Sequence, residues 1–403
     1  VEALMTELLG DDLQVRVRHG RLRLGDSWVR FPLRPTDLVR SLPPSFAAKA
    51  MRDTVWGPFR SRLARRRRTS SDDTFASVVR DGLGPAMLES FYGPYAEKLW
   101  GRHADDIAGD VARRRIAAAS PGKLLAKVAR AARREPIVFR YPRLGYGQVV
   151  DRLVERCHDA GVRLHTDTRV EAIDVGADRP VVTFASPDGV GETTFDRVFW
   201  TAPVRPLSDV VVSPPSAAPS VEVEHRAMVL VYLVFEGDPV TEFDAHYLPG
   251  PDEFATRVSE PRNYRDGPDP DDVTVLCAEV PCIVGDDVWN AEADSLAEQV
   301  LDDLQRLGVT DRRHVSAEVA RLPHVYPIIG PDDVEALDTA QRWAHDLPGV
   351  SVFGRQGLTV ADNLHHVMDM GLAAASRLGE DGTWDDAAWR GDLQLFATHV
   401  VED

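Results

Sequence analysis

The sequence DLPGVSVFGRQGLTVADNLHHVMDMGLAAASRL, residues 346–378, sets the expectations for the rest of the chain. Val350–Phe353 fits a short buried strand, a Gly-Arg turn follows at residues 354–355, and a long helix begins near Asn363. A helix that starts behind such a turn offers backbone N–H groups without internal partners, which suits an anion or a dipole. An ordinary strand–loop–helix of an α/β domain has the same pattern, so this segment alone does not indicate a function.

The composition predicts a folded, soluble protein. The chain has 403 residues, of which 43% are hydrophobic and 28% are charged, as in globular proteins. This length favours two intertwined domains over one core. The longest apolar run, Met228–Phe235, is too short to span a bilayer, and no leader-like segment follows the first residue.

The charge balance is strongly acidic. Net charge is −17, from 64 acidic and 47 basic residues, and a negative field of this size argues against general nucleic-acid binding. Only four of the basic residues are lysines, a composition that fits both a high-salt cytoplasm and a GC-rich genome. The one basic run, Arg60–Arg68, fits a solvated helix face better than a phosphate-binding patch, because no aromatic residue is interleaved with it.

The cysteines give no sign of a metal site. Cys157, Cys277 and Cys282 lack the spacing and the fourth ligand that zinc sites require. A sparse and odd number of cysteines predicts reduced thiols and a cytoplasmic setting.

Periodic patterns predict alternating helices and strands along the chain. Residues 1–10 have a helical apolar face ended by Gly10, and Asp12–Trp28 alternates like a β-hairpin with its turn at His19-Gly20. Further strands are expected at Arg163–Val175, Val181–Phe184, Asp196–Thr201, Met228–Phe235, Val273–Val280 and Val315–Tyr326. Further helices are expected over most of Ser45–Val128, at Gln148–Asp159 and at Ala291–Gly308.

The segment FYGPYAEKLWG, Phe91–Gly101, crowds aromatic and charged side chains around a Gly-Pro bend. Aromatic groups beside a carboxylate and an ammonium suit the wall of a pocket for a polar organic ligand. A helix end with its aromatic residues in the core and with Glu97 and Lys98 outside is an equally good interpretation.

The loop YPRLGYG, residues 141–147, places Gly145 and Gly147 directly before a predicted helix. The dinucleotide-binding pattern G-x-G-x-x-G is not met, because the third glycine is missing and no β-run immediately precedes the loop. Glycine still permits a close backbone approach to a cofactor where a Cβ would clash.

Taken together, three segments resemble the FAD-dependent amine-oxidase-like flavoproteins. They are FYGPYAEKLWG, then YPRLGYGQVVDRL with the TRVEAI strand and the TAP turn, and finally VFGRQGLTVADNLHHVMDMGLAAA. The resemblance is to the branch that contains protoporphyrinogen-oxidase-like and UDP-galactopyranose-mutase-like proteins. It covers almost the whole chain and is weakest at residues 205–315. It implies an α/β fold, α+β overall, in which a Rossmann-like FAD-binding domain is interleaved with a helical and β-sheet substrate domain.

The resemblance also implies site residues. Gly354 and Arg355 would lie beside the flavin, and the helix starting at Asn363 and Leu364 would turn its positive end to the reduced ring. The remaining cofactor-binding candidates are Val170 at the adenine, Thr201, Ala202 and Pro203 near the ribityl chain or ring, and Gly145 and Gly147. The candidates for the catalytic pocket are Tyr95, Glu97, Lys98, Trp100 and Arg355. Glu97 is either a proton acceptor or the ion partner of Lys98.

The resemblance also predicts how the chain is divided. The FAD-binding parts are expected at residues 136–206 and 321–380. The substrate side is expected at 1–135 and 207–320, followed by a C-terminal tail at 381–403. Such proteins begin with a strand, a G-x-G-x-x-G turn and a helix, which would lie before Val1. A truncated chain is the preferred explanation, ahead of a separate N-terminal FAD-binding piece and of a remnant that has lost flavin.

The expected function is that of an FAD-dependent oxidoreductase that removes hydride from a C–N or C–C bond of a small organic substrate. Two alternatives remain. One is a mutase-like isomerase that uses reduced FAD on a sugar nucleotide. The other is a non-catalytic flavoprotein-like remnant, or one piece of a split flavoprotein.

Overall fold

A computed structural model of the chain describes residues 1–32, 52, 73–115 and 137–401. The contacts divide the chain into two compact units. Unit 1 comprises Glu155–Glu224 together with the chain from Ile329 onward, and unit 2 comprises Glu2–Val154 and His225–Ile328. The division expected from the sequence, with FAD-binding parts at residues 136–206 and 321–380, stays a prediction.

Unit 2 is built on a seven-stranded sheet with the strand order β14-β10-β13-β12-β11-β2-β3. Its longest pairing is the antiparallel one of β10 and β13, in which Val231 lies opposite Ala278. The bounds of the strands are β2 Gly20–Leu24, β3 Ser27–Phe31, β10 Glu224–Glu236, β11 Ala245–Tyr247, β12 Arg257–Ser259, β13 Val273–Cys282 and β14 Ser316–Ile328. The strands predicted at 228–235, 273–280 and 315–326 are confirmed.

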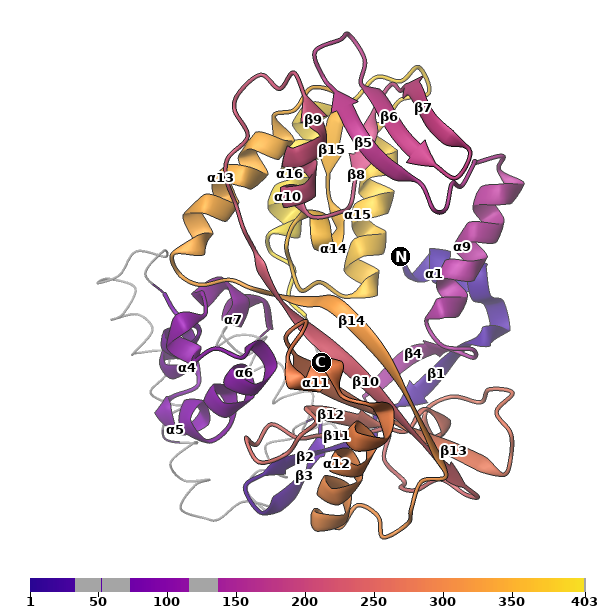
Figure 1. Ribbon diagram of the computed structural model, residues 1–403, viewed down its shortest axis with the longest axis vertical. Helices are drawn as coiled ribbons and strands as arrows, with labels where there is room; N and C mark the ends of the chain where they lie inside the picture. The colour runs from indigo at the N-terminus through magenta and orange to yellow at the C-terminus, as the bar shows by residue number, and fades with distance from the viewer. Residues whose placement is uncertain (33–51, 53–72, 116–136, 402–403) are drawn as a thin grey trace. The chain divides into compact units, whose positions relative to one another are not determined.

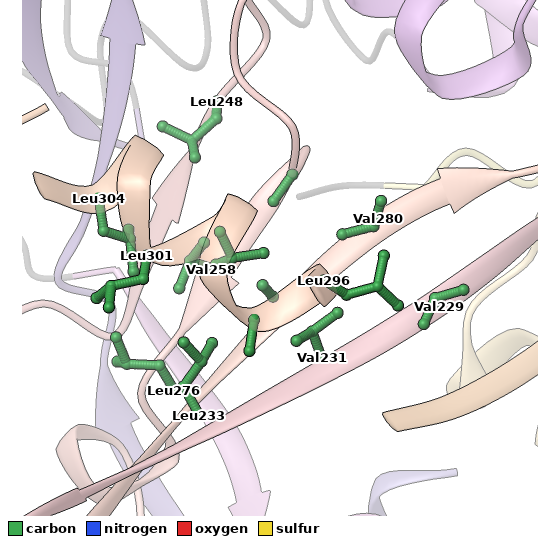
Figure 2. Packing of buried hydrophobic residues seen from close by; sticks show 14 of the residues in the cluster. Val229, Val231, Leu233, Leu248, Val258, Leu276, Val280, Leu296, Leu301 and Leu304 are labelled. Carbon is green, nitrogen blue, oxygen red and sulfur yellow. The ribbon is translucent and has the colours of Figure 1, made fainter. Parts of the chain in front are cut away.

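The helix α12 (Ala293–Arg306) covers one face of this sheet. Its apolar residues Leu296, Leu301 and Leu304 are buried, and they pack against inward-facing residues of β10 and β13 (Figure 2). Alternate residues of β10, such as Val229 and Val231, face this core, as the period of two in a strand requires. The amphipathic helix expected at 291–308 is therefore confirmed.

The predicted hairpin at Asp12–Trp28 is wrong. The strand β1 (Leu13–Val17) pairs with β4 (Val138–Pro142) in a separate two-stranded sheet, and β2 pairs with β3. The true two-residue turn is Gly25-Asp26, where Gly25 has φ +54°. At His19 the chain passes from one sheet to the other, because its N–H donates to the Asp244 carboxylate at 2.8 Å and its carbonyl accepts from the Asp244 N–H at 3.0 Å.

The part of the predicted helical region that the structure describes, residues 73–115, is helical. Its elements are α4 Phe75–Gly82, α5 Pro85–Met87, the π-helical turn Leu88–Tyr92, α6 Gly93–Trp100, a 3₁₀ turn at Ala104–Asp106 and α7 Gly109–Arg115. Thr74 starts α4 with a capping box to Ser77. The basic run at residues 60–68 lies outside the described residues. Unit 2 also contains α1 Glu2–Leu9, the 3₁₀ turns Gly10–Asp12 and Pro261–Asn263, and α11 Asp287–Asn290.

Unit 1 contains two sheets. Four strands have the order β7-β6-β5-β9, and β8 pairs in parallel with β15. Their bounds are β5 Arg169–Asp174, β6 Val181–Ser186, β7 Gly189–Thr194, β8 Val198–Trp200, β9 Val211–Val212 and β15 Val350–Val352. The helices are α10 Val204–Val210, α13 Asp333–His345, α14 Gly354–Gly357, α15 Leu364–Arg377 and α16 Asp386–Phe396, whereas α9 Gly147–Asp159 spans the boundary between the units (Figure 1).

The core of unit 1 lies where α10 and α13 cover the strands. Leu207 of α10 and Ala340 of α13 are fully buried against Ile173 of β5 and Val352 of β15. The short strand predicted at 350–353 and the helix predicted to begin near Asn363 are both confirmed. Among the described residues, none of the helices combines the length and the apolar character needed to cross a bilayer.

Candidate functional site

The candidate site in unit 1 forms where two parallel strands end. Val352 of β15 lies beside Trp200 of β8 in a parallel register, so both strands end at the same edge. The residues that follow are Thr201–Pro203 on one strand and Phe353–Arg355 on the other. Ligands of open α/β sheets bind outside the carboxyl ends of the strands. Two predicted cofactor-binding segments, far apart in the sequence, therefore meet at the edge where such sites occur.

Gly354 is held against the end of the neighbouring strand. The Phe353 N–H donates to the Trp200 carbonyl at 3.1 Å, and Gly354 then adopts φ +86°, a conformation that favours glycine. A Cβ at this position would come within 3.5 Å of the Thr201 Cβ. The turn between β15 and α14 thus depends on this glycine.

Gly357, which was not among the predicted site residues, is packed more tightly. A Cβ at Gly357 would lie 3.2 Å from the Val352 side chain and 3.3 Å from the Trp200 carbonyl. Its own carbonyl accepts a hydrogen bond from the Gln341 side chain at 2.9 Å. The signal in the sequence was the second glycine in GRQG, three residues after the first.

Arg355 is connected to the start of α15. Its Nη1 donates to the Asp362 carbonyl at 2.9 Å, and the next residue, Asn363, caps the helix. The cap is reciprocal, because the Asn363 side chain accepts from the N3 backbone and the His366 side chain accepts from the Asn363 N–H at 3.2 Å. A guanidinium and the positive end of a 14-residue helix therefore lie at the two ends of one loop.

Val170 belongs to the same unit but to the other sheet. It lies on β5 opposite Phe184, next to an irregularity in the register before Ala172. Its half-buried side chain packs against the core cluster that contains Val350 and Val352. The structure thus places every cofactor-binding candidate except Gly145 and Gly147 in unit 1.

The aromatic pocket candidates lie in unit 2 and pack inward. Trp100 is only 2% exposed and packs against Phe75, with the ring centroids 5.7 Å apart. Tyr95 stacks on Phe91 at 5.8 Å. These contacts fit the interpretation of α6 as a helix with its aromatic residues in the core.

Lys98 is held by the backbone. Its Nζ donates to the carbonyls of Leu248, Gly250 and Ala255 at 2.7, 2.9 and 2.7 Å. An ammonium has three N–H donors, so all three are used, and the expected ion pair with Glu97 is not formed through them. In that interpretation of α6 Lys98 lies outside, whereas in the structure it is partly buried. Burial lowers the pKa of Lys98 to about 8, against the opposing effect of the Glu253 carboxylate.

Glu97 and Lys98 border a cavity within unit 2. Its volume is about 560 Å³. The residues that line it are Glu97, Lys98, Arg226, Pro251, Asp252, Glu253, Phe254, Val280, Pro281, Gln299, Asp302 and Asp303. Carboxylates outnumber the two cations, and Glu253 among them is only 9% exposed. The cavity is therefore suited to a cationic ligand better than to an anionic one. The sequence signals were the acidic pairs at 252–253 and 302–303.

The loop with Gly145 and Gly147 is fixed by a carboxylate. Gln148 donates to Asp12 at 2.8 Å and accepts from the Leu144 N–H at 3.1 Å. Gly145 has φ +88°, and a Cβ at Gly147 would meet nothing within 4 Å among the described residues. The positive φ therefore favours glycine at 145, whereas nothing in the described residues requires glycine at 147.

An aromatic cluster beside this loop was not predicted. The ring of Tyr141 lies 4.9 Å from the rings of both Tyr146 and Tyr264. Burial raises the pKa of the Tyr146 and Tyr264 phenols. The cluster offers hydroxyl groups on an apolar wall. Its partner Tyr264 is remote in sequence, which is why the YPRLGYG motif alone did not indicate it.

Comparison with known proteins identifies the class. The sequence model of the flavin-containing amine oxidoreductase family matches residues 8–366. Because the match covers most of the 403 residues, the chain belongs to this family. No curated protein matches the chain in a sequence search.

Three solved structures illustrate the shared fold. Reduced UDP-galactopyranose mutase gives a TM-score of 0.72 at 16% identity, over 100% of this chain and 86% of that chain. A protein assigned as a protoporphyrinogen oxidase from Exiguobacterium sp. 255-15 gives 0.63 at 14% identity, over 92% and 84%. Wild-type putrescine oxidase bound to putrescine gives 0.55 at 16% identity, over 93% and 86%.

The family and the fold class predicted from the sequence are thereby confirmed. At these identities the solved structures show the fold alone, and they include both oxidases and a mutase. The roles assigned to individual site residues stay predictions.

Proposed function

We propose that this protein is an FAD-dependent oxidoreductase that removes hydride from a C–N or C–C bond of a small organic substrate. The observation that carries the proposal is the meeting of Thr201–Pro203 and Gly354–Arg355 at the ends of two parallel strands, in a chain of the flavin-containing amine oxidoreductase family. When bound, FAD supplies the redox chemistry, and the protein supplies placement and electrostatics.

The residues of unit 1 fit a flavin. At Gly354 a cofactor can approach the backbone closely because no Cβ is present. Thr201 and Ala202 are exposed just after the end of the neighbouring strand β8. Arg355 and the start of α15 at Asn363 and Leu364 would stabilise negative charge at one end of the ring. In this proposal Val170 holds the adenine through its backbone, and a role of the Gly145/Gly147 loop stays a prediction.

The charge of the unit 2 cavity favours the oxidoreductase over a sugar-nucleotide isomerase. A nucleotide diphosphate is doubly anionic, and sites for it are built from arginines and backbone N–H groups. The cavity instead contains the carboxylates of Asp252, Glu253 and Asp302, and the ammonium of Lys98 is already bound to three carbonyls. A neutral or cationic substrate is the better match.

The direct test is anaerobic mixing of the purified FAD-loaded protein with candidate substrates. We expect amines or similar reductants to abolish the absorbance of oxidised flavin in the blue part of the spectrum. This absorbance should return when an electron acceptor is added. Conversion of a nucleotide sugar only after dithionite reduction would instead support the mutase-like alternative. Stoichiometric flavin bound to the purified full-length product would exclude the remnant. The cytoplasmic setting, and a separate N-terminal piece as partner, stay predictions.

Replacing Arg355 by methionine should weaken FAD binding. The variant removes a cation and the hydrogen bond to the Asp362 carbonyl that holds the loop before α15. A charge-assisted hydrogen bond contributes about 1.5–3 kcal/mol, so the dissociation constant should rise about tenfold or more. Quenching of FAD fluorescence during titration measures it. Arg342→Met, on the exposed face of α13, is the matched control and should bind FAD like the wild type. Equal affinity in both variants would contradict the placement of Arg355.

A further inference from the structure

A cluster of three potential metal ligands lies at the start of α15. Asp362, His366 and His399 each offer one ligand atom, and these three atoms lie within 4.8 Å of one another. All three residues belong to unit 1. Asp362 precedes the helix cap, His366 is in the first turn of α15, and His399 follows α16. The cluster therefore connects the C-terminal segment to the loop before α15, which Arg355 holds by its hydrogen bond to the Asp362 carbonyl.

The carboxylate of the cluster is buried and already bonded to one imidazole. The Asp362 side chain is 1% exposed, and its Oδ2 lies 2.7 Å from the His399 Nδ1. Because these two atoms lie so close, both can reach one ion only if His399 coordinates through Nδ1 and carries its proton on Nε2. Burying a carboxylate raises the free energy of the folded state unless a cation or hydrogen-bond donors compensate its charge.

The two imidazoles are held in place by packing. The rings of His366 and His399 stack with an interplanar angle of 18° and a centroid distance of 4.5 Å. His399 also contacts Phe396 of α16, at 5.5 Å between ring centroids. Because His399 is 12% exposed and His366 is half-buried, the pair is shielded but still reachable from solvent.

We propose that Asp362, His366 and His399 form a binding site for a divalent transition metal ion of the Zn²⁺ or Co²⁺ type. Two imidazole nitrogens and one carboxylate oxygen are ligands of intermediate softness, which suit these ions better than Mg²⁺ or Ca²⁺. Three protein ligands leave a coordination position for water or for another ligand. The site lies beside the cap of α15, so a bound ion would also tie the C-terminal segment to that cap.

Coordination requires a small rearrangement that can be stated in advance. Ligand atoms of a tetrahedral zinc site lie about 3.3 Å apart. The Asp362 Oδ2 and His399 Nδ1 atoms, now 2.7 Å apart, therefore have to separate, whereas ligand atoms up to 4.8 Å apart have to approach. An imidazole that binds a metal through one nitrogen carries its proton on the other. His366 therefore exchanges the bond that its Nδ1 accepts from the Asn363 N–H for the metal bond. Metal binding should thus release the Asn363 N–H.

The test is titration of the purified full-length protein with Zn²⁺ by calorimetry and with Co²⁺ by visible absorption. We expect one ion per chain and the d–d bands of a low-coordinate Co²⁺ site. His366→Gln and His399→Gln should each raise the dissociation constant about 100-fold or more, since even the loss of an outer-shell partner costs 10–100-fold. Asp362→Asn keeps the volume and should weaken binding in the same direction.

The matched control is His365→Gln. His365 is exposed and lies on the same turn of α15, with its ring 4.0 Å from that of His366, but it is outside the cluster. Its variant should bind the ion like the wild type. Circular dichroism checks that each variant is folded. In addition, the amide resonance of Asn363 should shift when Zn²⁺ is added to the wild-type protein.

Three outcomes would overturn the proposal. They are no saturable binding of Zn²⁺ or Co²⁺ to the wild type, binding that survives in both histidine variants, and equal loss in His365→Gln. In the first case the cluster would be an Asp–His hydrogen bond that holds the C-terminal segment without a metal ion.

Discussion

Replacing Glu260 by alanine should lower the free energy of unfolding by at least about 3 kcal/mol, because several buried donors would lose their acceptor. The Glu260 side chain is 0% exposed in unit 2. Its carboxylate accepts from the backbone N–H groups of Val240 and Thr241 at 2.7 and 2.9 Å. It also accepts from the Thr274 hydroxyl at 2.7 Å and from the Asn263 amide at 3.1 Å.

These bonds make Glu260 the common anchor of three segments of unit 2. It fixes the loop after β10, the 3₁₀ turn at Pro261–Asn263 and the first residues of β13. A water molecule filling the space would satisfy only some of the donors. The loss is therefore larger than the removal of one surface ion pair, which is worth about 0–1 kcal/mol.

Urea unfolding measures the effect as a lower midpoint at unchanged slope. The matched control is Glu236→Ala, at the exposed end of β10, which should change stability by less than about 0.5 kcal/mol. Glu260→Gln keeps the volume but sets an amide N–H₂ against donors, so it should fall between the two. Equal stability of Glu260→Ala and Glu236→Ala would show that the carboxylate does not hold these segments.

Local patterns predicted much of the fold. The helical spacing of Leu296, Leu301 and Leu304 predicted α12, and the apolar run at residues 228–235 predicted β10. Both signals are strong because one face of each element is buried in a continuous core. The strand, turn and helix of residues 350–377 were equally readable, since glycine, capping residue and apolar runs follow one another within a single stretch.

The sequence patterns did not predict which strands pair with each other. The alternation of Asp12–Trp28 was correct for strands, but β1 pairs with β4, more than a hundred residues later in the chain. The step at His19-Gly20 looked like a turn because glycine allows one. In the structure glycine serves another need, since a Cβ at Gly20 would come within 3.0 Å of the Asp244 carboxylate. The two-residue Gly25-Asp26 turn was the better hairpin signal.

The chemistry of single side chains was harder still to predict. Lys98 and Glu97 are adjacent in sequence, yet the ammonium binds carbonyls at 248–255. Asp362 and His399 belong to different segments, and nothing local in either marks the other. Such contacts depend on tertiary packing, which a motif of ten residues does not encode. Family resemblance supplied the flavin expectation, whereas the acidic cavity and the Asp362 cluster came from the structure.

Replacing Lys98 by methionine should destabilise the protein by about 2–3 kcal/mol at pH 7, since three buried carbonyls would lose their donor at about 1–3 kcal/mol each. The substitution also removes a buried charge. The lowering of the Lys98 pKa from 10.5 to about 8 puts that relief at about 3 kcal/mol. The loss of the donor to three carbonyls outweighs the relief from removing the buried charge, so the net effect is destabilising. The matched control is Glu97→Gln, on the exposed side of the same helix, which should leave stability unchanged.

The pH dependence separates this structural role of Lys98 from a catalytic one. Between about pH 8 and 10.5 the unfolded chain keeps the Lys98 proton while the folded protein releases it, so the unfolded state binds more protons. The free energy of unfolding of the wild type should therefore rise relative to Lys98→Met as the pH increases through this window. Urea unfolding of both proteins at several pH values measures the difference, in which groups common to both cancel. If Lys98→Met keeps wild-type stability and loses only turnover, the ammonium acts on substrate or cofactor, and the structural role is wrong.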